Sequence, residues 1–302
     1  MRALLGTLLT RVDQSWKSMH SVCGLRTCQN TLIMRSLPES RVGIRMGQLW
    51  YCSIDCFANA ARTRFSALSI PSTVKMPHTP RVSIGLVMLS KGYLSGEQLR
   101  LAVAQSQLSG EELEVVLIQL GLANEWQLAA ARAVQWGYPV LGQDRISHSV
   151  DADIPVTLLR TFSAVPLHYS ATAKRLLLGF VHRVENSLLH SVEQVTGCKA
   201  EPCFITPTEF RERMERLTAA PHYTELVVED GLTPAQTAKA VGGFAVEIGA
   251  REASFAYCRN YAWMRLSGKR RTMDVLFQGR NAAEAETHKT FLASGEHIRY
   301  LR

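Results

Sequence analysis

A short helical pattern occurs twice in this chain, and its second copy follows soon after the first. In each copy an apolar helical pattern runs into a glycine, Gly92 or Gly121, the residue that most readily takes the left-handed conformation just after a helix. A polar residue, Ser95 or Asn124, then stands where a second apolar helix begins, and both residue types cap helix starts. The repeat therefore predicts two helical hairpins within residues 84–135.

Further short patterns follow the repeat in a fixed order. They are the string Trp136–Leu141, a helix over Ile154–Thr161, the string Ala164–Leu167, a strand over Arg175–Phe180, a helix over Ser187–Thr196, the string Ala200–Ile205 and a helix over Thr208–Leu217. This order resembles the N-terminal domain of the type II secretion and type IV pilus assembly ATPases (GspE, PilB, MshE). The resemblance implies a helical-hairpin pair followed by a small α/β domain, over residues 81–218.

Composition indicates packed globular modules, because 46% of the residues are hydrophobic and 20% are charged. A chain of 302 residues exceeds one typical domain, so we expect two or three modules. No stretch approaches the roughly 18–20 apolar residues that span a bilayer. The apolar run near the start is broken by Arg11 and Asp13, so we expect no export signal and a cytoplasmic protein.

The formal net charge of +8 raises the question of anionic partners. Basic residues are concentrated in the N-terminal region and at Lys269–Arg271. They form no dense lysine and arginine stripe with interleaved aromatic residues, which nucleic-acid-binding surfaces commonly show. The pattern argues against nucleic-acid binding, which we keep as an alternative.

Four of the seven cysteines lie near the N-terminus, as Cys23-x4-Cys28 and Cys52-x3-Cys56. In a cytoplasmic chain, short paired spacings favour a metal site over disulfides. Zinc takes four such ligands in a tetrahedron, and the segment Val42–Tyr51 is typical of a strand, a turn and a strand that would deliver the second pair. We predict a structural zinc module over residues 1–65, followed by a proline-rich linker over residues 66–80.

The string Trp50–Phe57 resembles one half of a treble-clef zinc finger of the TRASH type. In such fingers the second cysteine pair opens a helix, which here would cover Ile54–Leu68. The first pair departs from that pattern, because four residues separate Cys23 and Cys28 where those fingers usually have two. A degenerate, metal-free relic of the finger is therefore the alternative.

The C-terminal region predicts a helix and three strands. The expected elements are a strand over Glu225–Asp230, a helix that Thr233 caps and that runs to Ile248, and strands over Ala253–Cys258, Tyr261–Ser267 and Arg271–Phe277. The strings Ala245–Ala250 and Met264–Gly268 resemble the second domain of the same ATPases, whereas that domain's acidic string is replaced by Arg251–Cys258. We predict a truncated α/β module over residues 219–280 with a three-stranded antiparallel sheet, and a polar tail over residues 281–302 with a helix at Ala282–Ala293.

Catalytic patterns are absent from the sequence. It contains no Gly-x4-Gly-Lys-Ser/Thr, the loop that cradles the phosphates of ATP, so we expect no ATP binding and no ATPase activity. The nine histidines are dispersed, and there is no nucleophile elbow and no evident carboxylate pair. We assign no catalytic residues and predict that the chain is not an enzyme.

Some members of the family bind cyclic di-GMP through a doubled motif that begins Arg-Leu-Gly and ends in Gln. The resemblance points to five candidate positions here: Arg81, Gly85, Gly92, Gly121 and Gln135. The motif arginines are replaced by Ser83 and Glu112, and Glu112 would set a negative charge against a diphosphate. The sequence thus keeps the motif glycines, which the fold needs, and lacks the motif arginines, which the ligand needs. The pattern therefore argues against cyclic di-GMP binding.

Taken together, these observations predict an α+β multidomain protein with structural zinc as its one cofactor. We interpret it as a non-catalytic adaptor that binds a protein partner, for which secretion or pilus machinery is the candidate. Two alternatives stay open: a cyclic di-GMP receptor with a degenerate motif, and a zinc-finger regulator that binds nucleic acid.

Overall fold

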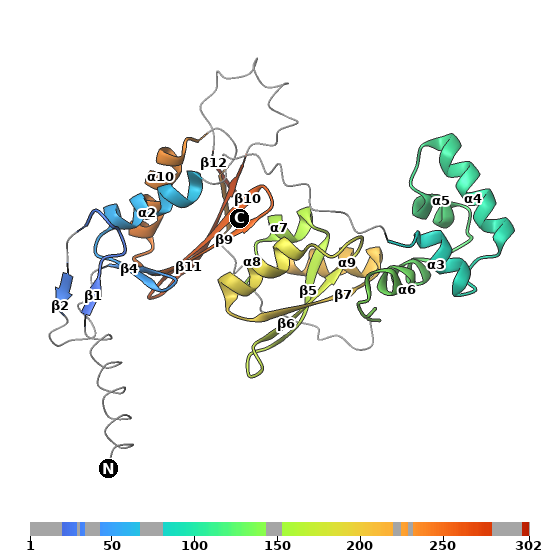
Figure 1. Ribbon diagram of the computed structural model, residues 1–302, viewed down its shortest axis with the longest axis horizontal. Coiled ribbons are helices and arrows are strands. Elements are labelled where there is room, and N and C mark those ends of the chain that lie inside the picture. Colours follow the sequence, from blue (N-terminus) through green and yellow to red (C-terminus); the bar gives the residue numbers. More distant parts are fainter. Residues whose placement is uncertain are drawn as a thin grey trace, which may run out of the picture. The chain divides into compact units, whose positions relative to one another are not determined.

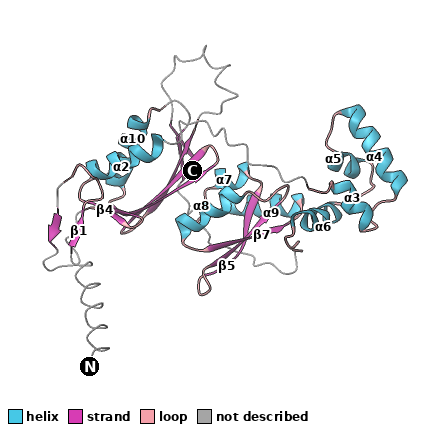
Figure 2. Ribbon diagram, in the orientation of Figure 1, coloured by secondary structure: helices cyan, strands magenta, loops and turns pink. Residues whose placement is uncertain are grey.

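The structure, a computed structural model, describes residues 20–28, 31–33, 43–66, 81–142, 153–219, 225–228, 232–279 and 298–301. The chain divides into two compact units, one formed by Met1–Pro71 with Thr224–Arg302 and one by Ser72–Tyr223. Both contain helices and strands, which confirms the α+β multidomain class (Figures 1 and 2). Most of the predicted linker and the predicted helix at residues 282–293 lie outside the described residues.

From residue 81 on, the described part of the unit Ser72–Tyr223 starts with four helices, which Figure 2 shows as an all-helical part. They are α3 (Ile84–Ser90), α4 (Gly96–Ser109), α5 (Leu113–Gln119) and α6 (Glu125–Trp136). The predicted caps are confirmed. Ser95 starts α4 and Asn124 starts α6, each with a reciprocal capping box to the glutamine three residues on.

The two repeat copies end their first helices with the same pair of hydrogen bonds. Gly92 (φ +69°) donates its backbone N–H to Leu89 at 3.0 Å, and Gly121 (φ +64°) donates to Ile118 at 3.0 Å. In each copy the next residue donates to the carbonyl five positions back, at 2.9 Å in the first copy and 3.0 Å in the second, which completes a Schellman motif. Glycine is required there because it takes a positive φ without strain.

The same unit continues into a small α/β part. Its elements are α7 (Val156–Thr161), β5 (Ala164–Ser170), β6 (Arg175–Phe180), α8 (Asn186–Thr196), β7 (Lys199–Phe204) and α9 (Pro207–Ala219). Strand β6 is central, with β5 antiparallel and β7 parallel to it. Helix α8 makes the crossover between the two parallel strands, as parallel pairing requires.

Polar contacts join the helical part of this unit to its α/β part. The Arg132 guanidinium on α6 donates to the Val181 carbonyl at 2.8 Å. The Glu125 carboxylate accepts from the backbone N–H and the hydroxyl of Thr208, at 3.0 and 3.1 Å, at the start of α9. Because a helix start carries unpaired N–H groups and a positive dipole end, this carboxylate stabilises α9 while it fixes α6 against it.

The other unit is built around a seven-stranded sheet. Its N-terminal elements are β1 (His20–Val22), β2 (Thr31–Ile33), β3 (Ile44–Met46), β4 (Leu49–Tyr51) and α2 (Ile54–Ser66). Its C-terminal elements are β8 (Glu225–Val228), α10 (Pro234–Glu247), β9 (Ala250–Cys258), β10 (Tyr261–Gly268), β11 (Thr272–Gln278) and β12 (Ile298–Leu301). The strand order is β12-β8-β11-β10-β9-β3-β4, and β1 pairs with β2 in a separate sheet.

This sheet joins segments that the sequence analysis described as two modules, residues 1–65 and 219–280. The predicted antiparallel pairs β9–β10 and β10–β11 are present, and β3 adds to β9 as a parallel strand. Figure 1 shows α2 beside α10, and the two helices are in contact. Phe57, Ala61 and Phe65 of α2 are buried in one core with residues of α10 and β9–β11. A cysteine module this small buries little apolar area alone. The core that it shares with the C-terminal elements provides the additional apolar burial.

Substituting Phe57 with alanine tests the shared core. Phe57 is 0% exposed, so Phe57→Ala should lower the free energy of unfolding by about 3–5 kcal/mol. Limited proteolysis read by mass spectrometry should then show faster cleavage within residues 250–278, in β9–β11. The control Asn59→Ala, at an exposed position of the same helix, should leave the cleavage rate unchanged. Faster cleavage confined to α2 would contradict a shared core.

Candidate metal centre and nucleotide-binding surface

The four N-terminal cysteines lie together. Cys23 follows β1 and Cys28 ends the next turn, while Cys52 precedes α2 and Cys56 lies in its first turn. All four Sγ atoms are within 4.8 Å of one another. Of the residues that the sequence analysis singled out, these four are the group that the structure brings into one cluster.

Backbone contacts hold the first cysteine pair against strand β4. Cys23 forms a parallel bridge with Trp50, and Gly24 donates its N–H to the Trp50 carbonyl at 2.7 Å. A side chain at Gly24 would place its Cβ 2.9 Å from the Leu49 Cβ, so glycine allows this close approach. The Cys28 N–H donates to a carbonyl three residues earlier at 2.9 Å, and this turn accommodates the four-residue gap.

The sulfur distances fit a metal site better than disulfides. Sγ of Cys52 lies 3.6 Å from Sγ of Cys28 and 3.6 Å from Sγ of Cys56. A tetrahedron with zinc–sulfur bonds of about 2.3 Å has sulfur–sulfur edges of about 3.8 Å. A disulfide needs sulfurs about 2.05 Å apart. The cluster could therefore hold a metal ion such as zinc.

The electrostatics of the cluster depend on what lies between the sulfurs. The Ser53 hydroxyl beside Cys56 lowers the pKa of that thiol, but burial and the neighbouring thiols of Cys52, Cys28 and Cys23 outweigh it and raise the pKa to about 12. A divalent cation reverses this balance because it stabilises thiolates directly. Without a cation the Cys56 thiol therefore stays protonated, whereas a bound cation would favour the thiolate form.

The candidate nucleotide-binding residues are engaged within their own unit. The Arg81 guanidinium lies 3.4 Å from the centre of the Trp136 ring, a cation–π contact. The Gln135 side chain donates to the Val82 carbonyl at 2.6 Å. A nucleotide that used either group would have to replace these contacts.

The three candidate glycines serve the fold. Gly92 and Gly121 end helices, as described above. Gly85 is buried in α3, and a Cβ there would lie 2.7 Å from Cδ1 of Leu99 on α4. Gly85 therefore permits the contact between α3 and α4, and its presence needs no ligand.

Sequence reasoning missed an ion pair in the second repeat copy. Glu114 stands where the ligand-binding motif has its glycine, and its carboxylate pairs with the Arg132 guanidinium. Arg132 is 5% exposed and also donates to the Val181 carbonyl. A signal was available, because an arginine interrupts the apolar face of α6. Its partner, 18 residues earlier, could not be identified without the fold.

Comparison with known proteins concerns less than half of the chain. No family model matches it. It is 27% identical over 145 residues to the type IV pilus assembly ATPase PilB of Thermus thermophilus, a match that covers 47% of this chain and 16% of PilB. The chain therefore spans about a sixth of the length of this curated relative.

Two solved structures are also similar. One is a structure of MshE with cdg, which has 22% sequence identity and a TM-score of 0.38. The match covers 45% of this chain and 99% of the MshE chain. The other is the N-terminal domain of XpsE, with 21% sequence identity and a TM-score of 0.34. That match covers 44% of this chain and 92% of the XpsE chain. The resemblance to secretion and pilus ATPase N-terminal domains is confirmed. It extends over 44–47% of the chain. Among the described residues, no helix is both long enough and apolar enough to cross a membrane.

Metal analysis tests the cysteine cluster. The chain purified under reducing conditions with added zinc should carry about one zinc ion, because four thiolates complete one tetrahedral site. Cys52→Ser should remove most of that zinc. The matched control Cys198→Ser, at a buried cysteine of the other unit, should retain it. A wild-type chain that stays metal-free after this treatment would support the metal-free relic instead.

Proposed function

We propose that the chain is a non-catalytic adaptor whose ATPase-like half binds a protein partner of secretion or pilus machinery. The observation that carries the proposal is the similarity of 145 residues to a pilus assembly ATPase, joined to a helical part that exposes many apolar side chains. The similarity indicates the kind of assembly, and the exposed side chains indicate protein recognition.

The exposed apolar side chains are concentrated in the helical part of the unit Ser72–Tyr223. Of the 16 exposed large hydrophobic residues in the described parts of the chain, 11 lie within residues 82–134. Isolated exposed leucines are ordinary on protein surfaces, whereas a concentration of them in one part of a chain favours protein recognition there. Figure 2 shows that this part consists of helices, which offer side chains on rigid faces.

Equivalent positions of the two repeat copies share this exposure. Leu86 on α3 is 54% exposed, and Val115, its counterpart on α5, is 44% exposed. Leu89 and Ile118, which also occupy equivalent positions, are 37% and 39% exposed. Neighbouring residues of both helices fill the helical core without them. Complete burial of one such side chain is worth about 1.5–3 kcal/mol, so a partner that covers several gains appreciable affinity.

The non-catalytic part of the proposal rests on the chemistry that phosphoryl transfer needs. Such enzymes hold the nucleotide phosphates in a glycine-rich loop with a lysine and position Mg²⁺ with acidic ligands. The sequence contains no such loop. Among the described residues, the side chains gathered as a potential metal site are the four thiols, which suit a structural ion better than Mg²⁺.

ATP hydrolysis and cyclic di-GMP binding are both expected to be absent. Hydrolysis by the full chain should not exceed that of a mock preparation, and rates well above it would overturn the adaptor proposal.

Calorimetric titration with cyclic di-GMP, up to about 0.1 mM, should show no saturable heat, because Arg81 and Gln135 are engaged and Glu114 is paired within the protein. Saturable binding that Arg81→Ala removes would instead support a second-messenger receptor.

Partner capture tests the helical surface. The full chain should recover a component of secretion or pilus machinery from cells of its own source, and Leu86→Glu with Val115→Glu should reduce that recovery at least tenfold, because both place a charge on an apolar contact. The control Lys91→Glu with Gln105→Glu adds negative charge at exposed polar positions of the same part and should leave recovery intact. Equal recovery by all three proteins would exclude this surface as the docking site.

A further inference from the structure

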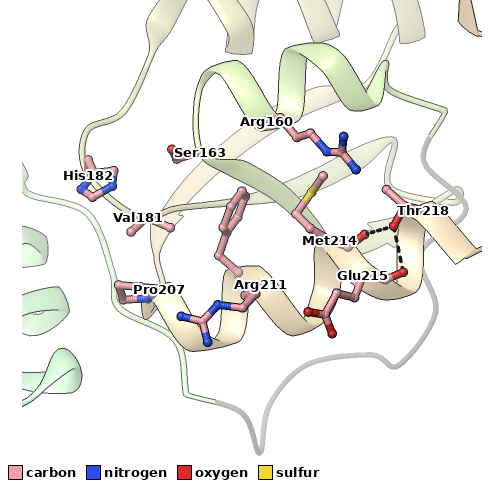
Figure 3. Close-up of a pocket in the computed structure, with 10 residues that line it drawn as sticks. Arg160, Ser163, Val181, His182, Pro207, Arg211, Met214, Glu215 and Thr218 are labelled. Atoms are coloured by element: carbon pink, nitrogen blue, oxygen red, sulfur yellow. Dashed lines mark hydrogen bonds between the residues drawn. The ribbon is translucent and has the colours of Figure 1, made fainter. Parts of the chain in front are cut away.

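A hollow of about 370 Å³ opens on the α/β part of the unit Ser72–Tyr223 (Figure 3). Its walls are the end of α7, the residues just after β6 and one side of α9. It lies within residues 160–218 and includes neither the cysteine cluster nor the residues of the cyclic di-GMP motif.

The hollow has an apolar base. Val181 is 2% exposed and Met214 is 7% exposed, and Phe210, one turn before Met214 on α9, is partly buried beside them. These side chains offer an aromatic ring and a thioether, which adapt well to the shape of an inserted apolar group.

The rim of the hollow carries cations. Arg160 comes from α7 and Arg211 from α9, as Figure 3 shows, and Glu215 is the one carboxylate among the lining residues. Within the described part of the chain, neither guanidinium has an ion-pair or hydrogen-bond partner. By contrast Arg213 and Arg216, on the same helix, both pair with glutamates. The two unpaired guanidinium groups are thus free to pair with a ligand.

Two further polar residues, His182 and Ser163, line the hollow. His182 faces the hollow, and its pKa is lowered mainly by burial and then by the Arg132 cation, so its ring offers a hydrogen bond in neutral form. Ser163 has a φ of +48°, a strained conformation for a residue other than glycine. Its N–H donates to the Arg160 carbonyl at 3.2 Å, and its own carbonyl accepts from the Val181 N–H at 3.1 Å. This turn fixes the backbone of the rim.

We infer that this hollow docks an acidic segment of a partner protein. A bulky apolar side chain of that segment packs on Phe210 and Met214, while flanking carboxylates pair with Arg160 and Arg211. Guanidinium groups pair with carboxylates through two parallel hydrogen bonds, which gives orientation as well as attraction. An apolar anchor surrounded by polar contacts is the usual form of a protein-recognition site. The inference rests on the proposed adaptor function and names the chemistry of the partner segment.

Selection from a random peptide display library against the full chain tests the inference. Enriched peptides should carry a bulky apolar residue flanked by aspartate or glutamate. Fluorescence anisotropy with a synthetic copy of one such peptide should then show affinity at least tenfold weaker for Arg160→Glu with Arg211→Glu, because like charges replace attraction. Both side chains are exposed, so the fold should tolerate the change, which circular dichroism checks.

The matched control is Arg175→Glu with Arg216→Glu, which makes the same charge change at exposed arginines that do not line the hollow. It should leave peptide affinity within twofold of wild type. Failure to enrich any peptide, enrichment without acidic residues, or unchanged affinity of the Arg160 and Arg211 variant would overturn the inference.

The surface variant Leu86→Glu with Val115→Glu separates this inference from the proposed function. If that variant and not the arginine variant loses the peptide, the hollow is not the site and the adaptor proposal stands. If the arginine variant loses the peptide while the chain captures no secretion or pilus component, the hollow stands as a peptide site and the proposed function fails.

Discussion

The parallel pairing of β3 with β9 is the contact on which the cysteine-containing unit depends. It sets Arg45 beside Glu252 and Met46 beside Ala253, and so joins the beginning of the chain to its C-terminal strands. The same pairing places β4 at the edge of the sheet, where it anchors the first cysteine pair. It also brings α2, which carries the last cysteine of the cluster, against α10. The thiols are therefore held by the core of the whole unit, so a metal ion bound to them would also stabilise the folded sheet.

The other unit uses its polar groups mainly to hold its own parts together. Arg132 and Glu125 fix α6 against the α/β part, and Gln135 binds the backbone at Val82. Of the five candidate nucleotide-binding residues, Gln135 is engaged in this way, and Arg81 packs on the Trp136 ring. Exposed large hydrophobic side chains are concentrated in the helical part, and two exposed arginines, Arg160 and Arg211, line the hollow beside α9. These two surfaces are the basis of the proposed docking of partner proteins.

Local signals in the sequence predicted the local structure well. Ser95, Asn124 and Thr233 cap helices as expected. Such caps can be predicted because the capping residue and the glutamine three positions later interact within one helical turn. Most predicted helices and strands agree with the structure to within a few residues. The four cysteines could be chosen as a set because their paired spacing is itself a local pattern.

Features that depend on distant residues could not be predicted. Strand β3 has three residues, and nothing near it in the sequence specifies a parallel partner at the other end of the chain. The buried pair of Arg132 with Glu114 and the hollow between Arg160 and Arg211 likewise arise only when separate elements pack together. Residues 1–65 and 219–280 were predicted as independent modules because each segment shows its own helices and strands in the sequence. In the structure, residues of both segments form a single core.

Hydrogen exchange of the zinc-loaded full chain, compared before and after metal removal by a chelator, tests whether the cysteine cluster and the seven-stranded sheet share one core. Exchange should become faster after metal removal both in α2 and in residues 250–278 of β9–β11, because α2 and these strands lie in one core. Exchange in residues 84–136 of the other unit should not change. Loss of protection confined to residues 20–56, with β9–β11 unaffected, would contradict it and show that the cysteine module folds apart from the sheet.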